Sequence, residues 1–389
     1  MGEWKDLILD NIAIINPAEK LQKGKIAKKV AMDTLQPFTK KVPGYTLEPY
    51  NGGMKFKNGD TIVARITPCF ENGKTAYIDI LEDDEVGFGS TEYIVIRERK
   101  GVSDKHFLYY FAISPDFRDI AILSMSRSSG RQRVQTDFLR NHVFVIPPLP
   151  EQRAIASVLS SLDDKIDLLH RQNKTLEAMA ETLFRQWFVE EVDEGWEEGS
   201  LLELIQLVGG GTPKTSISDY WDGDIPWLAG GDIASNHKSF ILKTEKTITE
   251  KGLKNSSAKL LPKFATIISA RGTVGKYCLL AQPMAFSQSN YGILPKVDNC
   301  YFFTYLLINH LVEELQSSAY GSVFDTITTT TFKENRILIP TKDKIIGFET
   351  VVFPYFNKMF VNKSQIHTLE KLRDTLLPKL MSGEVRVNV

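Results

Sequence analysis

Residues 147–190 read PPLPEQRAIASVLSSLDDKIDLLHRQNKTLEAMAETLFRQWFVE and predict one unbroken helix. Apolar side chains recur in this stretch at every third or fourth position, which is the spacing of one helix face. The residues on positions a and d of a single heptad frame are Ile155, Leu159, Leu162, Ile166, Leu169, Leu176, Ala180, Leu183 and Trp187, with the polar Asn173 at an a position. At about 1.5 Å per residue the helix is about 60 Å long. The pattern favours a coiled-coil strand that needs a partner, although an amphipathic helix on an ordinary domain is the alternative.

The same pattern returns 193 residues further along the chain. Adding this offset to the frame gives Phe348, Val352, Tyr355, Met359, Asn362, Ile366, Leu369, Arg373, Leu376 and Leu380, of which eight are apolar. The flanking sequence repeats as well, because Val-Ile-Pro at 145–147 matches Leu-Ile-Pro at 338–340. A constant offset over such a span indicates an internal duplication.

Connectivity favours antiparallel packing of the two helices. A parallel pair would require residues 191–340 to carry the chain back along the whole first helix, whereas antiparallel helices place the end of one beside the start of the next. Matching the first and last seam positions pairs residues whose numbers sum to 535, so Asn173 faces Asn362. Two amides can satisfy each other in an apolar seam and fix its register. Arg373 fits the seam poorly, and we expect its guanidinium to reach out to solvent.

The segments before each long helix predict β-rich lobes. Residues 61–65 and 266–271 are the clearest matched strands, and a Gly-Lys pair opens the next strand in each lobe. Helices are predicted over 104–125, interrupted at Pro115, and over 299–320, and a short amphipathic helix over 4–17 runs into a strand. The fold class is therefore α+β: two β-rich mixed α/β domains joined by two long helices packed as an antiparallel coiled coil, with a pseudo-two-fold internal repeat.

Composition limits the classes of protein to consider. The chain has 389 residues, of which 42% are hydrophobic, enough for two domain cores beside the helical pair. No apolar run reaches the length of a membrane span, and the first ten residues do not resemble a signal peptide. Cys69, Cys278 and Cys300 are too scattered for a disulfide framework or a Cys-x-x-Cys metal pair. We therefore expect a soluble, reduced, cytoplasmic protein.

Bulk charge does not mark either lobe as a polyanion binder. Residues 1–150 carry 21 basic and 19 acidic side chains, and residues 191–340 carry 13 and 17. Any nucleic-acid contact must come from local segments or from a partner. The candidate segments are a lysine cluster at 20–29, SRSSGRQRVQT at 126–136 and YGSVFDTITTTT at 320–331. Arg and Gln can pair with guanine and adenine edges, although a solvated loop is the alternative for the lysines and an exposed strand face for Thr328–Thr331.

Motifs of catalysis are missing from the sequence. The segment VGGGTPKTS at 208–216 is not a phosphate-binding Walker A loop, because Pro213 precedes Lys214 where the motif needs Gly. The chain also lacks His-Glu-x-x-His, a Gly-x-Ser-x-Gly elbow, a Gly-x-Gly-x-x-Gly opening a βαβ unit, and the Asp-Pro-Pro-Tyr or Asn-Pro-Pro-Tyr of an amino-methyltransferase. Arg65 and Arg271, which follow the matched strands, are interpreted mainly as anchors of the fold.

The order lobe, long helix, lobe, long helix resembles the specificity subunit of type I restriction-modification enzymes over essentially the whole chain. The most specific marks are Pro-Leu-Pro-Glu-Gln at 148–152 and the closing TLEKLRDTLLPKLMSGEV at 368–385. The segments GGGTPKT, IPWLAGGDI and SARGTVGK are similar to elements of the target recognition domains of that family. The second helix departs from the pattern, because its first turns lack Glu-Gln and Pro354 lies inside the heptad frame, which leaves its start open.

The resemblance implies a non-catalytic DNA-binding subunit. Each lobe would read one half of a split DNA sequence, the helices would set the distance between the half-sites, and two methyltransferase (M) subunits would dock, joined by endonuclease/translocase (R) subunits. S-adenosylmethionine, ATP and Mg would bind to these partners, with no cofactor on this chain. The implied division is a first target recognition domain at 1–147, a spacer helix at 148–190, a second recognition domain at 191–340, and a second helix with the C-terminal tail at 341–389.

The expected DNA contacts and the alternatives complete this hypothesis. The candidate DNA-binding residues are Lys23, Lys25, Lys28, Lys29, Ser90, Thr91, Arg127, Arg131, Gln132, Arg133, Gln135, Lys214, Thr215, Ser216, Lys238, Gln288, Ser289, Asn290, Ser322 and Thr326. The main alternative is a coiled-coil scaffold whose lobes bind proteins and not DNA. A self-contained methyltransferase or nuclease is disfavoured by the missing motifs. The bases that are read cannot be deduced from the sequence.

Overall fold

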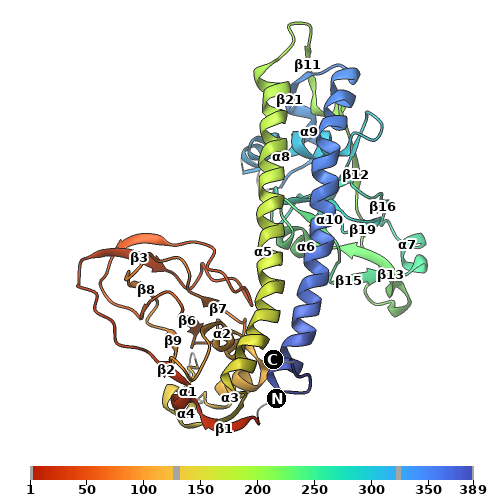
Figure 1. The fold of residues 1–389 in the computed structure, drawn as a ribbon. Helices are drawn as coiled ribbons and strands as arrows, with labels where there is room; N and C mark the ends of the chain where they lie inside the picture. Colours follow the sequence, from red (N-terminus) through yellow and green to blue (C-terminus); the bar gives the residue numbers. More distant parts are fainter. Residues whose placement is uncertain (1–2, 126–131, 321–325, 388–389) are drawn as a thin grey trace. The chain divides into compact units, whose positions relative to one another are not determined.

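The computed structural model describes residues 3–125, 132–320 and 326–387 (Figure 1). It forms two compact units, one made of residues 1–167 with 367–389 and the other of residues 168–366. The two long helices, α5 (Leu149–Arg185) and α10 (Lys342–Met381), each contribute one part to either unit. Each unit therefore combines one β-rich lobe with segments of both long helices.

The first unit contains two four-stranded sheets and a two-stranded ribbon. The sheets have the strand orders β2-β9-β6-β7 and β4-β3-β8-β5, and the ribbon pairs β1 with β10. The elements are β1 (Lys5–Ile8), α1 (Leu9–Ile12), β2 (Ala13–Ile15), β3 (Ile26–Val30), β4 (Thr46–Pro49), β5 (Lys55–Phe56), β6 (Thr61–Ala64), β7 (Thr75–Tyr77), β8 (Gly87–Gly89), β9 (Tyr93–Glu98), α2 (Lys105–Ile113), α3 (Pro115–Leu123), α4 (Thr136–Asn141) and β10 (Val143–Ile146).

The second unit repeats this plan. Its sheets have the orders β12-β20-β17-β18-β14 and β15-β13-β19-β16, and its ribbon pairs β11 with β21. The strands are β11 (Glu197–Ser200), β12 (Ile205–Gly209), β13 (Trp221–Leu228), β14 (Phe240–Ile241), β15 (Lys246–Ile248), β16 (Leu260–Leu261), β17 (Thr266–Ser269), β18 (Tyr277–Leu280), β19 (Met284–Phe286), β20 (Asn290–Pro295) and β21 (Arg336–Ile339). The helices are α6 (Gly230–Ser235), α7 (Glu250–Lys254), α8 (Tyr301–Tyr320) and α9 (Thr329–Glu334), with short 3-10 turns at Leu201–Glu203 and Ser218–Tyr220.

Matching strands occupy matching places in the two units. The order β2-β9-β6-β7 of the first unit corresponds to β12-β20-β17-β18 of the second, and β4-β3-β8-β5 corresponds to β15-β13-β19-β16. The predicted α+β repeat is therefore confirmed at the level of topology. The Gly-Lys pairs open β7 and β18 as predicted, and Gly73 and Gly275 adopt positive φ angles of 71° and 78° that glycine tolerates without strain.

The long helices pack through the predicted seam within each unit. In the first unit Ile155 and Leu159 of α5 lie in one apolar core with Leu377 and Leu380 of α10. In the second unit the rings of Trp187 and Phe348, whose numbers sum to 535, lie 5.6 Å apart between their centroids. All seam residues named from the sequence are buried or half-buried: Leu159, Leu162, Ile166, Leu169, Asn173, Leu176, Leu183, Met359, Asn362, Ile366, Leu369 and Leu376.

The amide pair confirms the antiparallel register in the second unit. Asn362 is fully buried, and its Nδ2 donates to Asn173 Oδ1 at 2.8 Å. The side chain of Asn173 in turn donates from Nδ2 to the Met359 carbonyl at 3.4 Å. The contact between Trp187 and Phe348 agrees with this antiparallel direction, because Trp187 follows the end of α5 and Phe348 lies near the start of α10.

Arg373 does not reach out to solvent as predicted. Its side chain is 12% exposed, and Nη1 donates to Asp163 Oδ1 at 2.8 Å. Asp163 is 8% exposed and also accepts from the Tyr110 hydroxyl at 2.6 Å. The seam therefore holds a paired charge, because a carboxylate one position from the predicted partner Leu162 lies within reach of the guanidinium.

The structure gives the bounds of both long helices. The first helix begins at Leu149 and ends in a π-helical turn at Gln186–Glu190. The second runs from Lys342 through Pro354 without a break. Proline inside a helix costs about 3 kcal/mol, but the neighbouring Phe348, Val352 and Phe356 are fully buried, and each contributes about 1.5–3 kcal/mol of apolar burial.

One local prediction was incomplete and one was wrong. The short helix that runs into a strand is present as α1 and β2, but the strand β1 before it was not predicted. Residues 4–17 form β1, the short helix α1 and β2, because Lys5 to Ile8 pair with Ile146 to Val143 of the distant β10, which local periodicity does not reveal. The Thr run is not a strand face, since Thr328 is the N-cap of α9 and its Oγ1 accepts from the Thr331 N–H at 3.3 Å. The helix interruption predicted at Pro115 is confirmed, because Pro115 begins α3.

Candidate nucleic-acid interface

In the second unit several strands end together and send their loops to one edge of the sheets. β12 ends at Gly209 opposite Tyr291, and β17 ends at Ser269 opposite Asn290. The segment after α8 joins them, because the Ile327 N–H donates to the Ala270 carbonyl at 3.1 Å. We call residues 210–216, 229–231, 270–276, 287–289 and 326–328 the second loop edge.

Close backbone approach explains the glycine-rich motif of the second loop edge. A Cβ atom on Gly210 would lie 2.2 Å from the Ser287 carbonyl oxygen, so a larger residue does not fit there. The Gly211 N–H donates to the Phe286 carbonyl at 2.9 Å. The next hydroxyl, Thr212 Oγ1, donates to Gln288 Oε1. These glycines therefore bring two loops together and are not built around a phosphate.

The first unit has an equivalent edge. β6 ends at Ala64 opposite Tyr93, at the turn that joins β8 to β9. The segment after α3 lies against the β6–β7 loop, because Ile66 and Arg133 form an antiparallel bridge and Thr67 Oγ1 accepts from the Gln132 N–H at 3.1 Å. We call residues 65–74, 90–92 and 132–135 the first loop edge.

One backbone frame is common to both loop edges. In the first, the Arg65 N–H donates to the Glu92 carbonyl at 2.9 Å and the Arg65 carbonyl accepts from Val134 at 2.8 Å. In the second, the Ala270 N–H donates to the Ser289 carbonyl at 3.0 Å, and the Ala270 carbonyl accepts from Ile327. The frame thus aligns Arg65 with Ala270, and not with Arg271 as the strand comparison suggested.

The same frame carries different side chains in the two units. Residues Arg65, Glu92 and Arg133 of the first edge correspond to residues 270, 289 and 326 of the second, which are Ala, Ser and Thr. Charged groups therefore occupy one edge where short side chains occupy the other. This combination of constant backbone and variable side chains is the arrangement expected of a recognition surface.

A family model for the type I restriction modification DNA specificity domain matches residues 1–178 and again residues 193–370. The chain belongs to this family. It carries two specificity domains in tandem, so it is a DNA specificity subunit of a type I restriction-modification system, the non-catalytic part of such an enzyme complex. The predicted family is thereby confirmed.

Relatives agree with this membership. The chain is 25% identical over 405 residues to the type I restriction enzyme HindI specificity subunit of Haemophilus influenzae, covering 85% of this chain and 87% of that one. It is 30% identical over 195 residues to the MjaIX specificity subunit of Methanocaldococcus jannaschii, covering 49% and 45%. The crystal structure of a type I restriction-modification S subunit from M. genitalium has the same fold, with a TM-score of 0.61 at 16% identity over 99% of this chain and 96% of that one.

Three charged residues of the first loop edge, Arg65, Glu92 and Arg133, form one ion-paired cluster. Arg133 Nε donates to both Glu92 oxygens at 3.0 and 3.1 Å, and its Nη2 donates to Oε1 at 2.9 Å. Arg65 Nε lies 3.5 Å from the other oxygen of Glu92. Hydrogen bonding to Glu92 raises the pKa of Arg133, so its guanidinium stays charged. Ser90 and Thr91 lie in the same turn, where Ser90 Oγ accepts from the Glu92 N–H at 3.1 Å.

Several candidate lysines lie away from the loop edges. Lys28 and Lys29 lie on β3, where Lys28 pairs with Glu85 at 2.9 Å and Lys29 pairs with Glu48 at 2.8 Å. Lys28 is buried, and its ammonium group is held by Glu85, which raises its pKa; burial and this pairing keep it from being a DNA contact in our proposal. Lys23 and Lys25 are exposed and lie just before the first residue of β3. The other end of this strand is Val30, which pairs with Gly89.

Some candidate residues of the second specificity domain lie on its loop edge and others do not. Gln288 and Ser289 lie on the second loop edge, and Lys214, Thr215 and Ser216 are exposed on the loop that follows β12. Two other candidates lie outside the second loop edge. Asn290 is 1% exposed and donates from Nδ2 to Ser287 Oγ at 2.8 Å, and Lys238 Nζ lies 3.9 Å from Glu181 of α5. The candidates Arg127, Arg131 and Ser322 lie outside the described residues.

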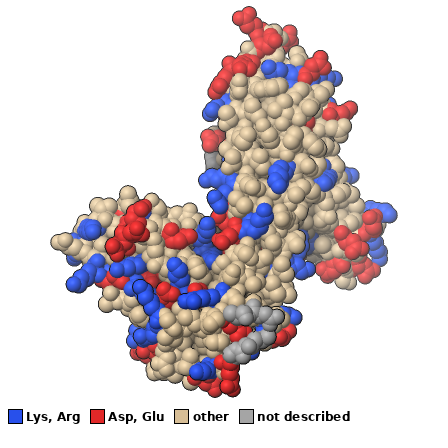
Figure 2. All heavy atoms as spheres, in the orientation of Figure 1, with Lys and Arg blue, Asp and Glu red and all other residues tan. Residues whose placement is uncertain are grey.

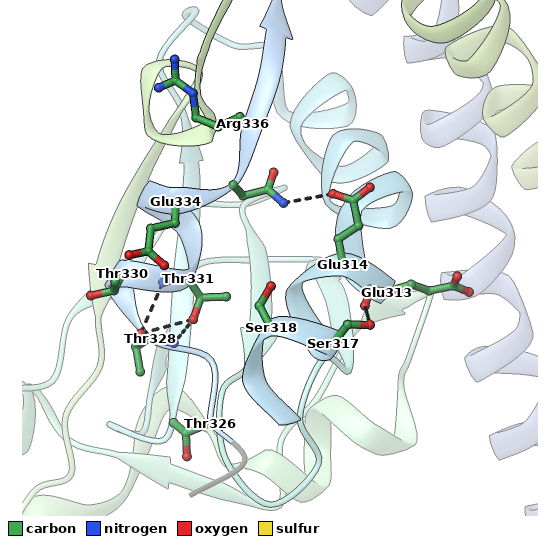
Figure 3. A pocket seen from close by; sticks show the side chains of 11 residues that line it. Glu313, Glu314, Ser317, Ser318, Thr326, Thr328, Thr330, Thr331, Glu334 and Arg336 are labelled. Atoms are coloured by element: carbon green, nitrogen blue, oxygen red, sulfur yellow. Dashed lines mark hydrogen bonds between the residues drawn. The ribbon is translucent and has the colours of Figure 1, made fainter. Parts of the chain in front are cut away.

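Acidic side chains limit where a phosphate backbone can lie on the second specificity domain. A hollow of about 800 Å³ beside Thr326 is lined by hydroxyl groups and by Glu313, Glu314 and Glu334, with Arg336 at its far side (Figure 3). Glu314 accepts from Asn335 Nδ2 at 3.1 Å, one of the contacts drawn there. Three carboxylates would repel phosphates, so contact with DNA is disfavoured in the hollow itself.

The visible surface shows no large basic face. In Figure 2 Lys and Arg are interspersed with Asp and Glu on the described part of the chain. The described residues also contain no group of three or more His, Cys, Asp or Glu side chains able to hold a metal ion. Within those residues no helix has the length and apolar character needed to cross a membrane.

Sequence reasoning overlooked Glu92, Thr212 and Thr273 as members of the loop edges. Thr273 Oγ1 lies 3.0 Å from Ser269 Oγ and donates to the Gly230 carbonyl at 3.4 Å, so it ties two loops together. Glu92 directly follows the candidates Ser90 and Thr91 in the sequence, which could have indicated its place on the loop edge. It was not chosen as a candidate because an acidic side chain by itself does not favour contact with DNA. Its place on the loop edge follows from its contacts with Arg65 and Arg133.

Proposed function

We propose that each specificity domain contacts one half of a split DNA sequence through its loop edge. The contacts would come from Ser90, Thr91, Gln132, Arg133 and Gln135 in the first domain. In the second they would come from Lys214, Thr215, Ser216, Gln288 and Ser289. Arg and Gln would read base edges, while hydroxyl groups and lysines would contact bases or phosphates.

A single observation carries this proposal: both loop edges are built on one hydrogen-bonded frame, yet they present different side chains. A frame that positions loops identically can present any set of reading groups without changes to the core. Two copies with different groups are suited to an asymmetric sequence in two parts. A scaffold that binds the same protein at both lobes would gain nothing from this difference.

Methyltransferase subunits are the partners that we propose for the long helices. Several large apolar side chains remain exposed on these helices, including Val158, Leu168 and Met179 of α5 and Val361 and Leu372 of α10. Apolar groups of this kind are suited to burial against another protein chain. We propose that the methyltransferases, and endonuclease subunits joined to them, bind S-adenosylmethionine, ATP and Mg.

The near-neutral charge of both domains fits this division of labour. Phosphate contacts supply much of the affinity of a DNA-binding protein, and this chain, with a net charge of −1, has no overall positive charge to attract them. We expect the isolated chain to bind its site weakly and the complex with methyltransferase to bind it tightly. Full affinity of the chain alone, in a gel-retardation titration, would contradict this part of the proposal.

A domain exchange tests the main proposal. Residues 1–147 would be replaced by the corresponding domain of another family member, and the methylated motif would be determined by sequencing the methylome of cells that also carry the methyltransferase. We expect one half of the split motif to change while the other half and the gap are retained. An unchanged motif in a fully active complex would show that the first domain does not read DNA.

A helix deletion tests the role of the long helices. Removing one heptad from each helix keeps the seam in register while it shortens the pair by about 10 Å, which is about three base pairs of duplex. We expect a shorter gap between the half-sites or loss of methylation. Full methylation with the original gap would show that the helices do not set the spacing.

A further inference from the structure

Glu92 occupies only one edge of the Arg133 guanidinium. The Glu92 carboxylate accepts from Arg133 Nε with both oxygens and from Arg133 Nη2 with one, at distances of 2.9 to 3.1 Å. The two N–H groups of Nη1 and the second N–H of Nη2 are left over, and Nη1 makes no hydrogen bond with the part of the chain that the structure describes. With its side chain 46% exposed, Arg133 therefore presents a free pair of parallel donors at the first loop edge.

The Arg133–Glu92 ion pair is itself held by neighbouring residues. The Glu92 N–H donates to Ser90 Oγ at 3.1 Å, and the Glu92 carbonyl accepts from Arg65 at 2.9 Å. Arg65 Nε lies 3.5 Å from the carboxylate, and the backbone of Arg133 pairs with Ile66. A long side chain that would otherwise sample many rotamers is thus fixed before any ligand arrives, which lowers the entropy lost on binding.

Two parallel donors in fixed orientation match one base edge best. The O6 and N7 atoms of guanine accept two parallel hydrogen bonds from arginine in the major groove, and no other base offers two acceptors there. A phosphate can also accept a bidentate pair, but a neighbouring carboxylate weakens any purely electrostatic attraction to phosphate. Building on the proposed function, we propose that Arg133 reads a guanine in the half-site of the first specificity domain and that Glu92 is its positioning residue.

The second domain supplies an internal comparison. The equivalent positions of its frame carry Ala270, Ser289 and Thr326, which have no long cationic side chain. The arginine–guanine contact at this place in the frame is therefore confined to the first half-site. Changing Arg133 should alter one position of one half-site and leave the other half-site as it was.

The test uses the full chain together with its methyltransferase, first with natural DNA. Once the methylome has given the split motif, Arg133→Lys and Glu92→Gln would be compared with wild type. Arg133→Lys keeps the charge but not the paired donors, so methylation at sites with the guanine should fall about tenfold to a hundredfold, the loss typical of one bidentate pair. Glu92→Gln frees the guanidinium, so the protein should accept other bases at that one position.

Modified duplexes then identify the acceptor atom. Each guanine of the first half-site would be replaced in turn by 7-deazaguanine, which lacks N7 but still pairs with cytosine. Wild type should lose affinity at one guanine, while Arg133→Lys should bind both duplexes equally. A matched control pair is Arg336→Lys and Glu198→Gln on the β11–β21 ribbon, whose Nε and Oε1 atoms lie 3.6 Å apart, and these variants should leave the motif unchanged.

The outcomes separate this inference from the proposed function. If the domain exchange changes one half-site but Arg133→Lys leaves the motif and the 7-deazaguanine effect intact, the first domain reads DNA and Arg133 is not its guanine reader. If Arg133→Lys weakens binding equally at every sequence, Arg133 contacts a phosphate and the inference is wrong. If the domain exchange itself changes nothing, the proposed function fails first.

Discussion

At the start of α5 the first unit attaches its lobe through a neutral amide and a paired carboxylate. Gln152 Oε1 accepts from the Asp104 N–H at 3.0 Å, beside the N-terminus of α2. Glu151 accepts from Trp4 Nε1 at 3.1 Å and pairs with Arg386 near the C-terminus. The hydrogen bond from Arg386 lowers the pKa of Glu151.

At the start of α10 the second unit attaches its lobe through a carboxylate that has no basic partner among the described residues. Glu349 accepts from the N–H groups of Phe302 and Phe303, at 3.2 and 2.7 Å, at the N-terminus of α8. Among the described residues its hydrogen bonds come from these two backbone N–H groups, and burial raises its pKa to about 7. It stands one helical turn beyond Ile345, the residue that matches Gln152 in the repeat.

The seam shows the same contrast. The first unit buries the ion pair Asp163–Arg373, and the second buries the amide pair Asn173–Asn362. The duplicated fold therefore prescribes where a polar group is needed, at a helix start or in the seam, but not which chemistry supplies it. Charge and pH should consequently affect the two units differently.

The largest expected difference lies in the seam. Arg373→Leu leaves Asp163 buried without its cation, which should lower the free energy of unfolding of the first unit by about 3 kcal/mol. Asn362→Leu leaves only a neutral amide unpaired, which should cost the second unit about 1–3 kcal/mol. Urea denaturation, with hydrogen exchange to assign each loss to its unit, measures both.

Double variants serve as controls for the seam. Asn173→Leu with Asn362→Leu removes both partners together, so most of the stability lost in the single variant should return. Equal costs for Arg373→Leu and Asn362→Leu would mean that the charge of the seam pair in the first unit is unimportant.

A smaller difference is expected at the two helix starts. Glu349→Ala removes the acceptor of two buried N–H groups, so the second unit should lose about 2–3 kcal/mol. Gln152→Ala leaves the Asp104 side chain in place, which accepts from His106 and Phe107 at 2.9 and 3.0 Å, so the first unit should lose only about 1–2 kcal/mol. Hydrogen exchange at the first-turn amides of α8 and α2 reports each loss separately.

The smallest expected difference concerns pH. Because the pKa of folded Glu349 is raised to about 7 from an ordinary value of 4.5, the folded state holds the proton more tightly, and stability is lost as the pH rises through this window. Glu349→Gln keeps an acceptor without the charge, so its stability relative to wild type should rise as the pH increases from 4.5 to 7.5.

Glu151 provides the opposite sign for comparison. Its pKa is lowered, so its contribution is present above its ordinary pKa and is lost as the pH falls. Glu151→Gln should therefore lose stability relative to wild type at neutral pH and approach it in acid. The same direction of change for both variants would refute the assignment of these two carboxyl groups.

Long-range repetition made the fold predictable from the sequence, and side-chain geometry limited the prediction of the site. The heptad frame and its offset gave the helix pair and the Asn173–Asn362 contact, because seam burial depends on periodicity alone. The Arg373–Asp163 pair was missed, since side chains can reach across adjacent seam positions. The loop edges were not predictable, because Arg133 and Glu92 come from distant segments that meet only through the backbone frame.

The most direct test gives the chain two copies of the same specificity domain. Residues 191–340 would be replaced by a second copy of residues 1–147, and the methylated motif would be determined in cells that carry the methyltransferase. If two equivalent domains on antiparallel helices each read one half-site, the motif should become an inverted repeat of the first half-site around a gap. A motif that still contains the original second half-site would contradict the account.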